Sequence, residues 1–174
     1  MKNTLKALVL CTAMLATSSF AQCSKGKDNA LDTFLANKGF TKLCFQKLAS
    51  QHAIVEVSVN GFKSNFIIDS GASVSVINNS DVSKFRLIPA SGIANVQATG
   101  VGGKVTTQSF MLDIFKIDQL KIKNKHIVAM DLSHIVDALT TVSDKEINGV
   151  IGQDILTRHK AVIDIASNTL YLMP

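Results

Sequence analysis

The chain has 174 residues, with 18 Lys and Arg against 13 Asp and Glu, which is a modest basic excess. This length suits one domain with a sizeable core. No basic run is interleaved with aromatic residues, so composition and charge exclude the usual footprint of a nucleic-acid-binding protein. The sequence also has no Cys-x-x-Cys and no His-Glu-x-x-His pattern, and we therefore expect no metal site and no cofactor.

The N-terminal segment has the features of a targeting peptide. Two lysines precede an apolar stretch over residues 7–16, and Ser19 and Ala21 put small residues at the positions that signal peptidase reads. We predict a signal peptide over residues 1–21 and a mature protein that is periplasmic or secreted; an uncleaved anchor is the alternative. The apolar stretch is too short for a membrane span, and no later segment approaches about 18 apolar residues, so we expect no stable span.

Residues 22–44 are predicted to form an N-terminal helical extension ahead of a single domain over residues 45–174. Within this extension, apolar residues spaced i, i+3, i+4 share one face of a short helix over residues 28–37. We expect the helix to pack as a lid or a brace on the domain that follows it.

The cysteines bear on this extension. Cleavage of the leader would remove Cys11 and leave Cys23 and Cys44 in an oxidising compartment. A disulfide between them would tie the N-terminal segment to the edge of the domain. Two free thiols, with Cys44 partly buried, are the other interpretation.

From residue 52 onward the hydrophobic pattern changes to that of β-strands. Apolar and polar residues alternate over residues 52–59, Asn60-Gly61 is a strong signal for a hairpin turn, and residues 62–68 end in a continuous apolar run. Further strands, short helices and a last hairpin are predicted at 108–115, 119–130, 132–139 (with Ser133 as a possible cap), 149–152, 154–159, 161–165 and 169–172. Many short strands with frequent turns predict a mostly β barrel or sandwich.

The apolar run that ends at Ile68 leads directly into Asp69. We expect the strand to place this carboxylate in the interior, and Gly71 to permit a tight turn in which N–H groups approach it. Ser70 could hold the loop, and Ser73 could add a hydrogen bond to the carboxylate. A common Asp-Ser-Gly turn at the end of a strand is the structural alternative.

A second segment carries Ile151, Gly152 and Asp154. We interpret it as structural: a buried strand that passes beneath the Asp69 loop, with Gly152 permitting a close backbone approach. Asp154 is expected to cap the helical turn that follows.

Taken together, these segments resemble the retropepsin-like aspartic proteases, in particular the single-lobe bacterial exported type. The resemblance extends over residues 45–174. Three sets of residues match family elements in order: the catalytic loop Asp69, Ser70, Gly71, Ala72 and Ser73; the glycine-rich flap Gly100, Val101, Gly102 and Gly103; and the second motif Ile151, Gly152 and Asp154.

The resemblance implies a mostly β, retropepsin-like acid-protease barrel of a single lobe, preceded by a short N-terminal helix. It also implies an aspartic endopeptidase that hydrolyses peptide bonds with a water activated between the two Asp69 carboxylates of a homodimer. The partners would be a peptide or protein substrate and a second copy of the chain. The alternative is a non-catalytic peptide- or protein-binding module on the same fold in the cell envelope.

Overall fold

The computed structural model describes residues 30–91, 96–100, 103–140 and 145–174. The predicted signal peptide, Cys11, Cys23, Val101 and Gly102 lie outside these ranges, so cleavage after residue 21 stays a prediction. Within the ranges, none of the helices has the length and apolar character needed to cross a membrane.

The observed elements include those expected from the sequence, together with short strands at residues 41–44, 46–47, 76–78 and 88–89 that the sequence did not predict. They are α1 (Ala30–Asn37), β1 (Thr41–Cys44), β2 (Gln46–Lys47), β3 (Ala53–Val59), β4 (Phe62–Ile68), β5 (Val76–Asn78), a 3-10 turn (Asn79–Asp81), β6 (Ile88–Pro89), β7 (Val96–Gly100), β8 (Gly103–Ile117), β9 (Leu120–Met130), α2 (Ser133–Thr140), β10 (Gly149–Ile151), α3 (Gln153–Leu156), β11 (Val162–Asp164) and β12 (Thr169–Leu172). The prediction of a mostly β protein with short helices is confirmed.

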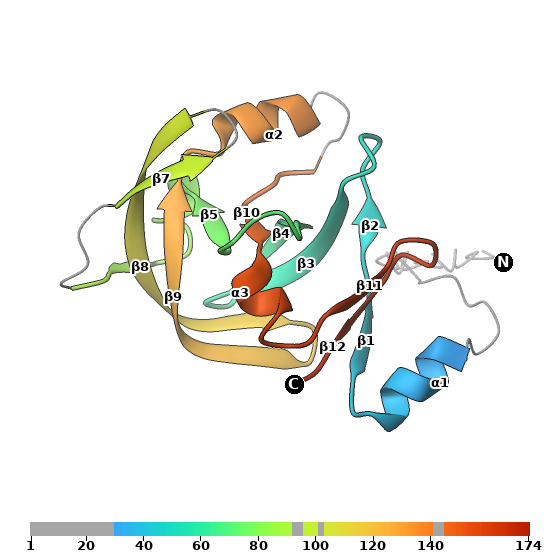
Figure 1. Ribbon diagram of the computed structural model, residues 1–174. Helices are drawn as coiled ribbons and strands as arrows, with labels where there is room; N and C mark the ends of the chain where they lie inside the picture. Colours follow the sequence, from blue (N-terminus) through green and yellow to red (C-terminus); the bar gives the residue numbers. More distant parts are fainter. Residues whose placement is uncertain (1–29, 92–95, 101–102, 141–144) are drawn as a thin grey trace, which may run out of the picture.

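Six strands form a closed barrel. They pair in the order β3, β4, β10, β5, β9, β8, and β3 also pairs with β8, which closes the circle. Figure 1 shows this barrel on the left, and on the right a smaller sheet of β1, β12 and β11 next to α1. The barrel prediction is therefore confirmed, and closure leaves few unpaired strand edges.

The Asn60-Gly61 turn helps to close the barrel. Both residues have positive φ, 49° and 92°, as the predicted two-residue hairpin between β3 and β4 requires. The Asn60 side-chain oxygen accepts hydrogen bonds from the backbone N–H groups of Asp113 (2.9 Å) and Ile114 (3.1 Å) in β8. Its amide nitrogen donates to the Phe85 carbonyl at 2.9 Å. One turn thus connects β3 and β4 to β8 and to the segment before β6.

β4, which leads to Asp69, and its neighbour β10 are buried on both faces. Phe66 in β4 and Ile151 in β10 face the core inside the barrel, whereas Ile67 and Val150 belong to a second apolar cluster that includes Leu139 of α2. A strand covered on both faces needs apolar residues at successive positions. This burial explains the continuous apolar run that ends β4.

The described part of the predicted N-terminal extension, residues 30–44, contributes β1 to the smaller sheet. β1 pairs antiparallel with β12 along its whole length. In α1, Asp32 accepts a hydrogen bond from the Tyr171 hydroxyl of β12 and one from Lys42 Nζ at 2.8 Å. Burial and the neighbouring Asp32 carboxylate raise the pKa of Tyr171 to about 12. Cys44 is disulfide-bonded, but both other cysteines lie outside the described ranges, so its pairing with Cys23 stays a prediction.

The two helix caps expected from the sequence are wrong in detail. Ser133 is the first residue of α2 and not the residue before it, and its N–H donates to the Asp131 carboxylate at 2.8 Å. This backbone hydrogen bond lowers the pKa of Asp131. At α3, the residue in the cap position is Gly152, which has no side chain to form a capping hydrogen bond. Asp154 lies inside this one-turn helix, so its side chain points to neighbouring segments instead.

The Asp154 carboxylate connects three segments. One oxygen accepts hydrogen bonds from the Ser75 N–H at 2.8 Å and the Ser75 hydroxyl at 2.6 Å. The other accepts a hydrogen bond from Lys125 Nζ in β9 at 2.5 Å. The side chains of this ion pair are only 26% and 14% exposed. A largely buried carboxylate with three donors fastens α3 to β9 and to the residue before β5.

We predict that Asp154→Asn destabilises the fold in a pH-dependent way. Burial raises the pKa of Asp154, but hydrogen bonds from Lys125 and Ser75 outweigh burial and hold it below its ordinary 3.8. The carboxylate therefore stabilises the fold above about pH 4, and this contribution is lost as the pH falls through the folded-state pKa. Urea unfolding at neutral pH should show that the variant has a free energy of unfolding about 1–3 kcal/mol lower than that of the unaltered protein. The loss should shrink at about pH 3.

Asp118→Asn is the control for this prediction. Asp118 is exposed in the turn between β8 and β9 and has a φ of 51°, which asparagine tolerates. Its replacement should change the free energy of unfolding by less than about 0.5 kcal/mol. Equal stability of the two variants at neutral pH would contradict the role assigned to Asp154.

Candidate active site

Asp69 follows the last residue of β4, and the adjacent strand holds its backbone. β10 lies between β4 and β5, pairing parallel with the first and antiparallel with the second. The Asp69 N–H donates to the Ile151 carbonyl at 3.0 Å, so the contact with β10 continues one residue past the end of β4. The position of Asp69 is therefore set by a strand that comes about eighty residues later in the sequence.

The Asp69 carboxylate is oriented by the turn that follows it. Its Oδ1 atom accepts the Gly71 N–H at 2.7 Å, as expected for a glycine at this position. A Cβ atom on residue 71 would lie 3.1 Å from the same oxygen, so glycine gives the carboxylate room. The side chain of Asp69 is exposed in the single chain, however, and the expectation that β4 would place it in the interior is wrong. The strand stops at Ile68, and the carboxylate projects from the surface loop.

The second motif supports this loop from beneath. The Ala72 carbonyl accepts the Gln153 N–H, and the Ser70 carbonyl accepts the Gln153 side-chain amide, both at 2.8 Å. A Cβ atom on Gly152 would lie 2.6 Å from the Val74 carbonyl carbon, so the backbone approach expected at this glycine is present. Sequence reasoning missed Gln153, although it stands between two residues that were singled out.

The serines of the loop differ from the expectation. Ser70 and Ser73 are both exposed, and in the described part of the chain no hydrogen bond joins the Ser73 side chain to Asp69. Gln153 of α3 bonds the loop backbone at Ala72 and Ser70, whereas Ser73 is exposed to solvent. The buried serine is Ser75, whose hydroxyl donates to Asp154 and accepts the Gly152 N–H at 3.0 Å. Its position between Val74 and Val76, directly before β5, was the available signal.

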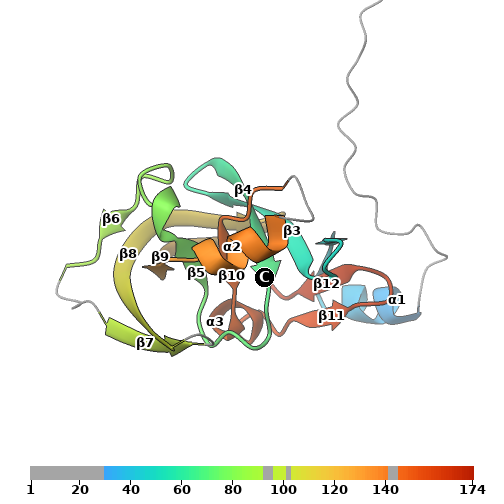
Figure 2. The same cartoon turned by 90° about the horizontal axis from the view of Figure 1, so that it is seen from above.

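The predicted flap corresponds to the hairpin of β7 and β8. These strands pair antiparallel, with Gly100 opposite Gly103, while Val101 and Gly102 lie outside the described ranges. Figure 2 shows β7, α3 and the green loop between β4 and β5 along the same side of the molecule. The fold thus brings β7, the first strand of the predicted flap, and the Asp69 loop to one side.

The arrangement provides one exposed carboxylate on a backbone held at several points. Such a group can accept or donate a proton at the surface, but one carboxylate cannot be general acid and general base in the same step. Among the residues that the structure describes, no three His, Cys, Asp or Glu side chains are grouped to hold a metal ion.

The fold is similar to that of solved proteases. One is a retropepsin-like aspartic protease from Rickettsia conorii, with a TM-score of 0.53 and 19% identity, covering 76% of this chain and 98% of that one. Others are the EIAV protease complexed with the inhibitor HBY-793 (TM-score 0.48, 21% identity, 67% and 95% covered) and the retroviral protease-like domain of Ddi1 from Leishmania major (0.48, 20%, 70% and 87%). The first of these similarities supports a retropepsin-like fold.

The family assignment comes from the sequence match. A search among curated proteins returns no match. Residues 55–155, more than half of the chain, match the family model described as an aspartyl protease. This range contains the Asp69 loop, β7 and β8, and the second motif through Asp154. The chain belongs to the aspartyl protease family, with a retropepsin-like fold.

Proposed function

We propose that the protein is an aspartic endopeptidase whose active site forms between two copies of the chain. The observation that carries this proposal is the Asp69 carboxylate, which is exposed and is held by the Gly71 N–H at 2.7 Å. The chain has a single Asp-Ser-Gly sequence, so a second carboxylate of the same kind must come from another copy. A two-fold axis next to the Asp69 loop would bring the two carboxylates together.

Two such carboxylates would divide the chemistry between them. At a separation of about 3 Å they share one proton, because two like charges so close cannot both ionise. The ionised group takes a proton from water as the water oxygen bonds to the peptide carbonyl carbon, and the protonated group donates its proton to the carbonyl oxygen. The leaving nitrogen then takes the proton that the first carboxylate accepted from water, the second carboxylate accepts a proton from the gem-diol, and the carbon–nitrogen bond breaks. The two carboxyl groups are thereby returned to their starting protonation states.

The location of the flap hairpin supports a peptide substrate. β7 lies on the same side of the molecule as the Asp69 loop (Figure 2). An extended peptide held between the loop and the hairpin would pair through its main chain, as strands do in β-augmentation. Closure of the hairpins over the peptide would exclude water from the reacting bond.

The second candidate is a peptide- or protein-binding module without catalysis. Its support is the same exposed Asp69, since one chain alone lacks the second carboxylate. The two functions differ in what happens when Asp69 is replaced and when copies are mixed.

Asp69→Asn is expected to abolish cleavage of a peptide library, with a loss of at least about 10²–10⁴-fold. The amide cannot act as the base, but its oxygen can still accept the Gly71 N–H, so folding should be unchanged. Cleavage rates and circular dichroism measure the two effects. Asp118→Asn, at an exposed turn, is the matched control and should retain activity. Unimpaired cleavage by Asp69→Asn would rule out Asp69 as the catalytic carboxylate.

Mixing tests whether the site is shared. Excess Asp69→Asn protein added to the unaltered protein should lower its activity by more than dilution, because each mixed dimer holds a single Asp69 carboxylate. The same excess of Asp118→Asn protein should not. Activity that only follows the concentration of unaltered chains would mean that one chain works alone, and sedimentation at the assay concentration would then show a monomer.

A further inference from the structure

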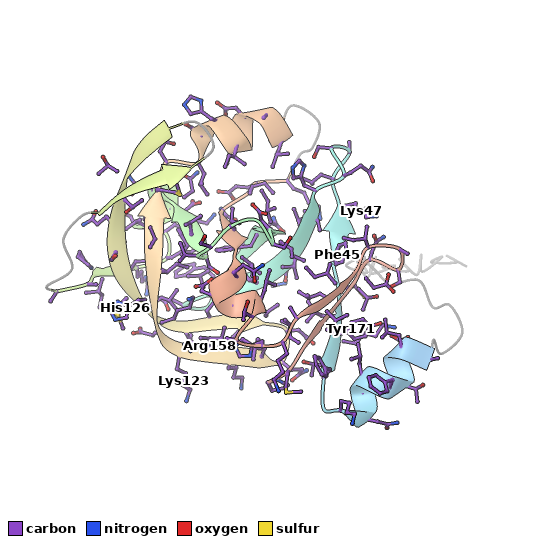
Figure 3. The ribbon with its side chains drawn as sticks, in the orientation of Figure 1. Phe45, Lys47, Lys123, His126, Arg158 and Tyr171 are labelled. Carbon is purple, nitrogen blue, oxygen red and sulfur yellow. The ribbon has the colours of Figure 1, made fainter. Side chains whose placement is uncertain are left out.

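A basic pocket lies apart from the Asp69 loop, between β9 and α3. It has a volume of about 300 Å³, and Lys123, Lys125 and His126 from β9 line it together with Asp154 and Arg158. Figure 3 labels Lys123, His126 and Arg158 around the part of β9 that passes α3. Its lining includes no residue of the Asp69 loop or of β7, among the residues that the structure describes.

The backbone explains why these cations converge. Lys123 and Lys125 are two residues apart on one strand, and side chains with this spacing point to the same face. Helical hydrogen bonds continue beyond α3. The Thr157 N–H donates to the Gln153 carbonyl, and the His159 N–H donates to the Ile155 carbonyl. Arg158 is four residues after Asp154, so both side chains lie on one face of this turn, toward β9.

The pocket has more positive than negative charge. Lys125 is paired with Asp154 at 2.5 Å, whereas no ion pair within the described residues involves Lys123 or Arg158. With His126 neutral, three cationic side chains and one carboxylate give a net charge of +2. Exposed lysines scattered on a convex surface would be solvated separately. Here the cations surround one concavity, with the fully buried Ile155 in its lining, and their potentials add.

We propose that this pocket binds the phosphate group of a small molecule. A phosphate dianion matches the net charge, and the planar guanidinium of Arg158 suits two parallel hydrogen bonds to phosphate oxygens. Lys125 has three N–H donors and Asp154 accepts a hydrogen bond from one of them, so its ammonium has donors left for a second anion. The volume is at the lower end for small-molecule pockets, which favours a compact phosphate over an extended peptide.

Calorimetric titration of the full chain with inorganic phosphate and with methyl phosphate tests the site, with chloride maintaining constant ionic strength. Both Arg158→Gln and Lys123→Gln should raise the dissociation constant about tenfold, by removing a charge-assisted contact. Lys121→Gln is the matched control, since it removes the same charge from an exposed position of β9 outside the pocket. Its affinity should equal that of the unaltered chain.

The titrations also separate this site from the proposed peptidase site. Phosphate binding should persist in Asp69→Asn, so failure of one proposal leaves the other standing. Tighter binding of methyl phosphate would identify a phosphate monoester as the ligand, and tighter binding of inorganic phosphate would identify the free ion. The proposal would be overturned if phosphate gave no more heat than a titration with chloride. It would also be overturned if Lys121→Gln and Arg158→Gln weakened phosphate binding equally.

Discussion

The arrangement of the Asp69 loop depends on β10 lying between β4 and β5. These two flanking strands are close in sequence, yet they do not pair with each other; β10 pairs with both. Because β10 is parallel to β4, its Ile151 carbonyl is positioned to accept the Asp69 N–H. The loop must therefore pass around the end of β10, and this passage brings Gly152 within contact of the loop backbone.

Burial on both faces gives this arrangement its rigidity. The barrel core covers one face of β4 and β10, and the cluster with α2 covers the other. Removing either layer would expose apolar residues of the strands that carry the loop. The loss of stabilising free energy would be roughly 25 cal/mol for each Å² of apolar surface exposed. In the proposed two-copy site, the Asp69 carboxylate would have to meet its counterpart in register. A rigid base would favour this, since small errors in position weaken acid–base chemistry strongly.

Polar interactions then connect the loop to the rest of the barrel. Ser75 is 1% exposed and hydrogen-bonds both Asp154 and the Gly152 N–H, and Asp154 in turn pairs with Lys125. Each buried polar group in this set has a partner, so their burial does not leave an unpaired charge. Lys125 also lines the basic pocket. The same ammonium therefore pairs with Asp154, which supports the loop, and lies at the proposed phosphate site.

Local patterns in the sequence determined the longer strands, the Asn60-Gly61 turn and the Asp-Ser-Gly loop, because each depends on residues that are neighbours in the chain. The short strands β1, β2, β5 and β6 were not predicted. The continuous apolar run before Asp69 indicated burial, but it did not show that the carboxylate itself would be exposed. That outcome depends on where β4 ends relative to β10. Likewise, Ser75 and Lys125 are 79 and 29 residues from Asp154, and β1 is far from its partner β12. Such contacts exist only after the barrel closes, since only the tertiary structure decides which distant side chains meet.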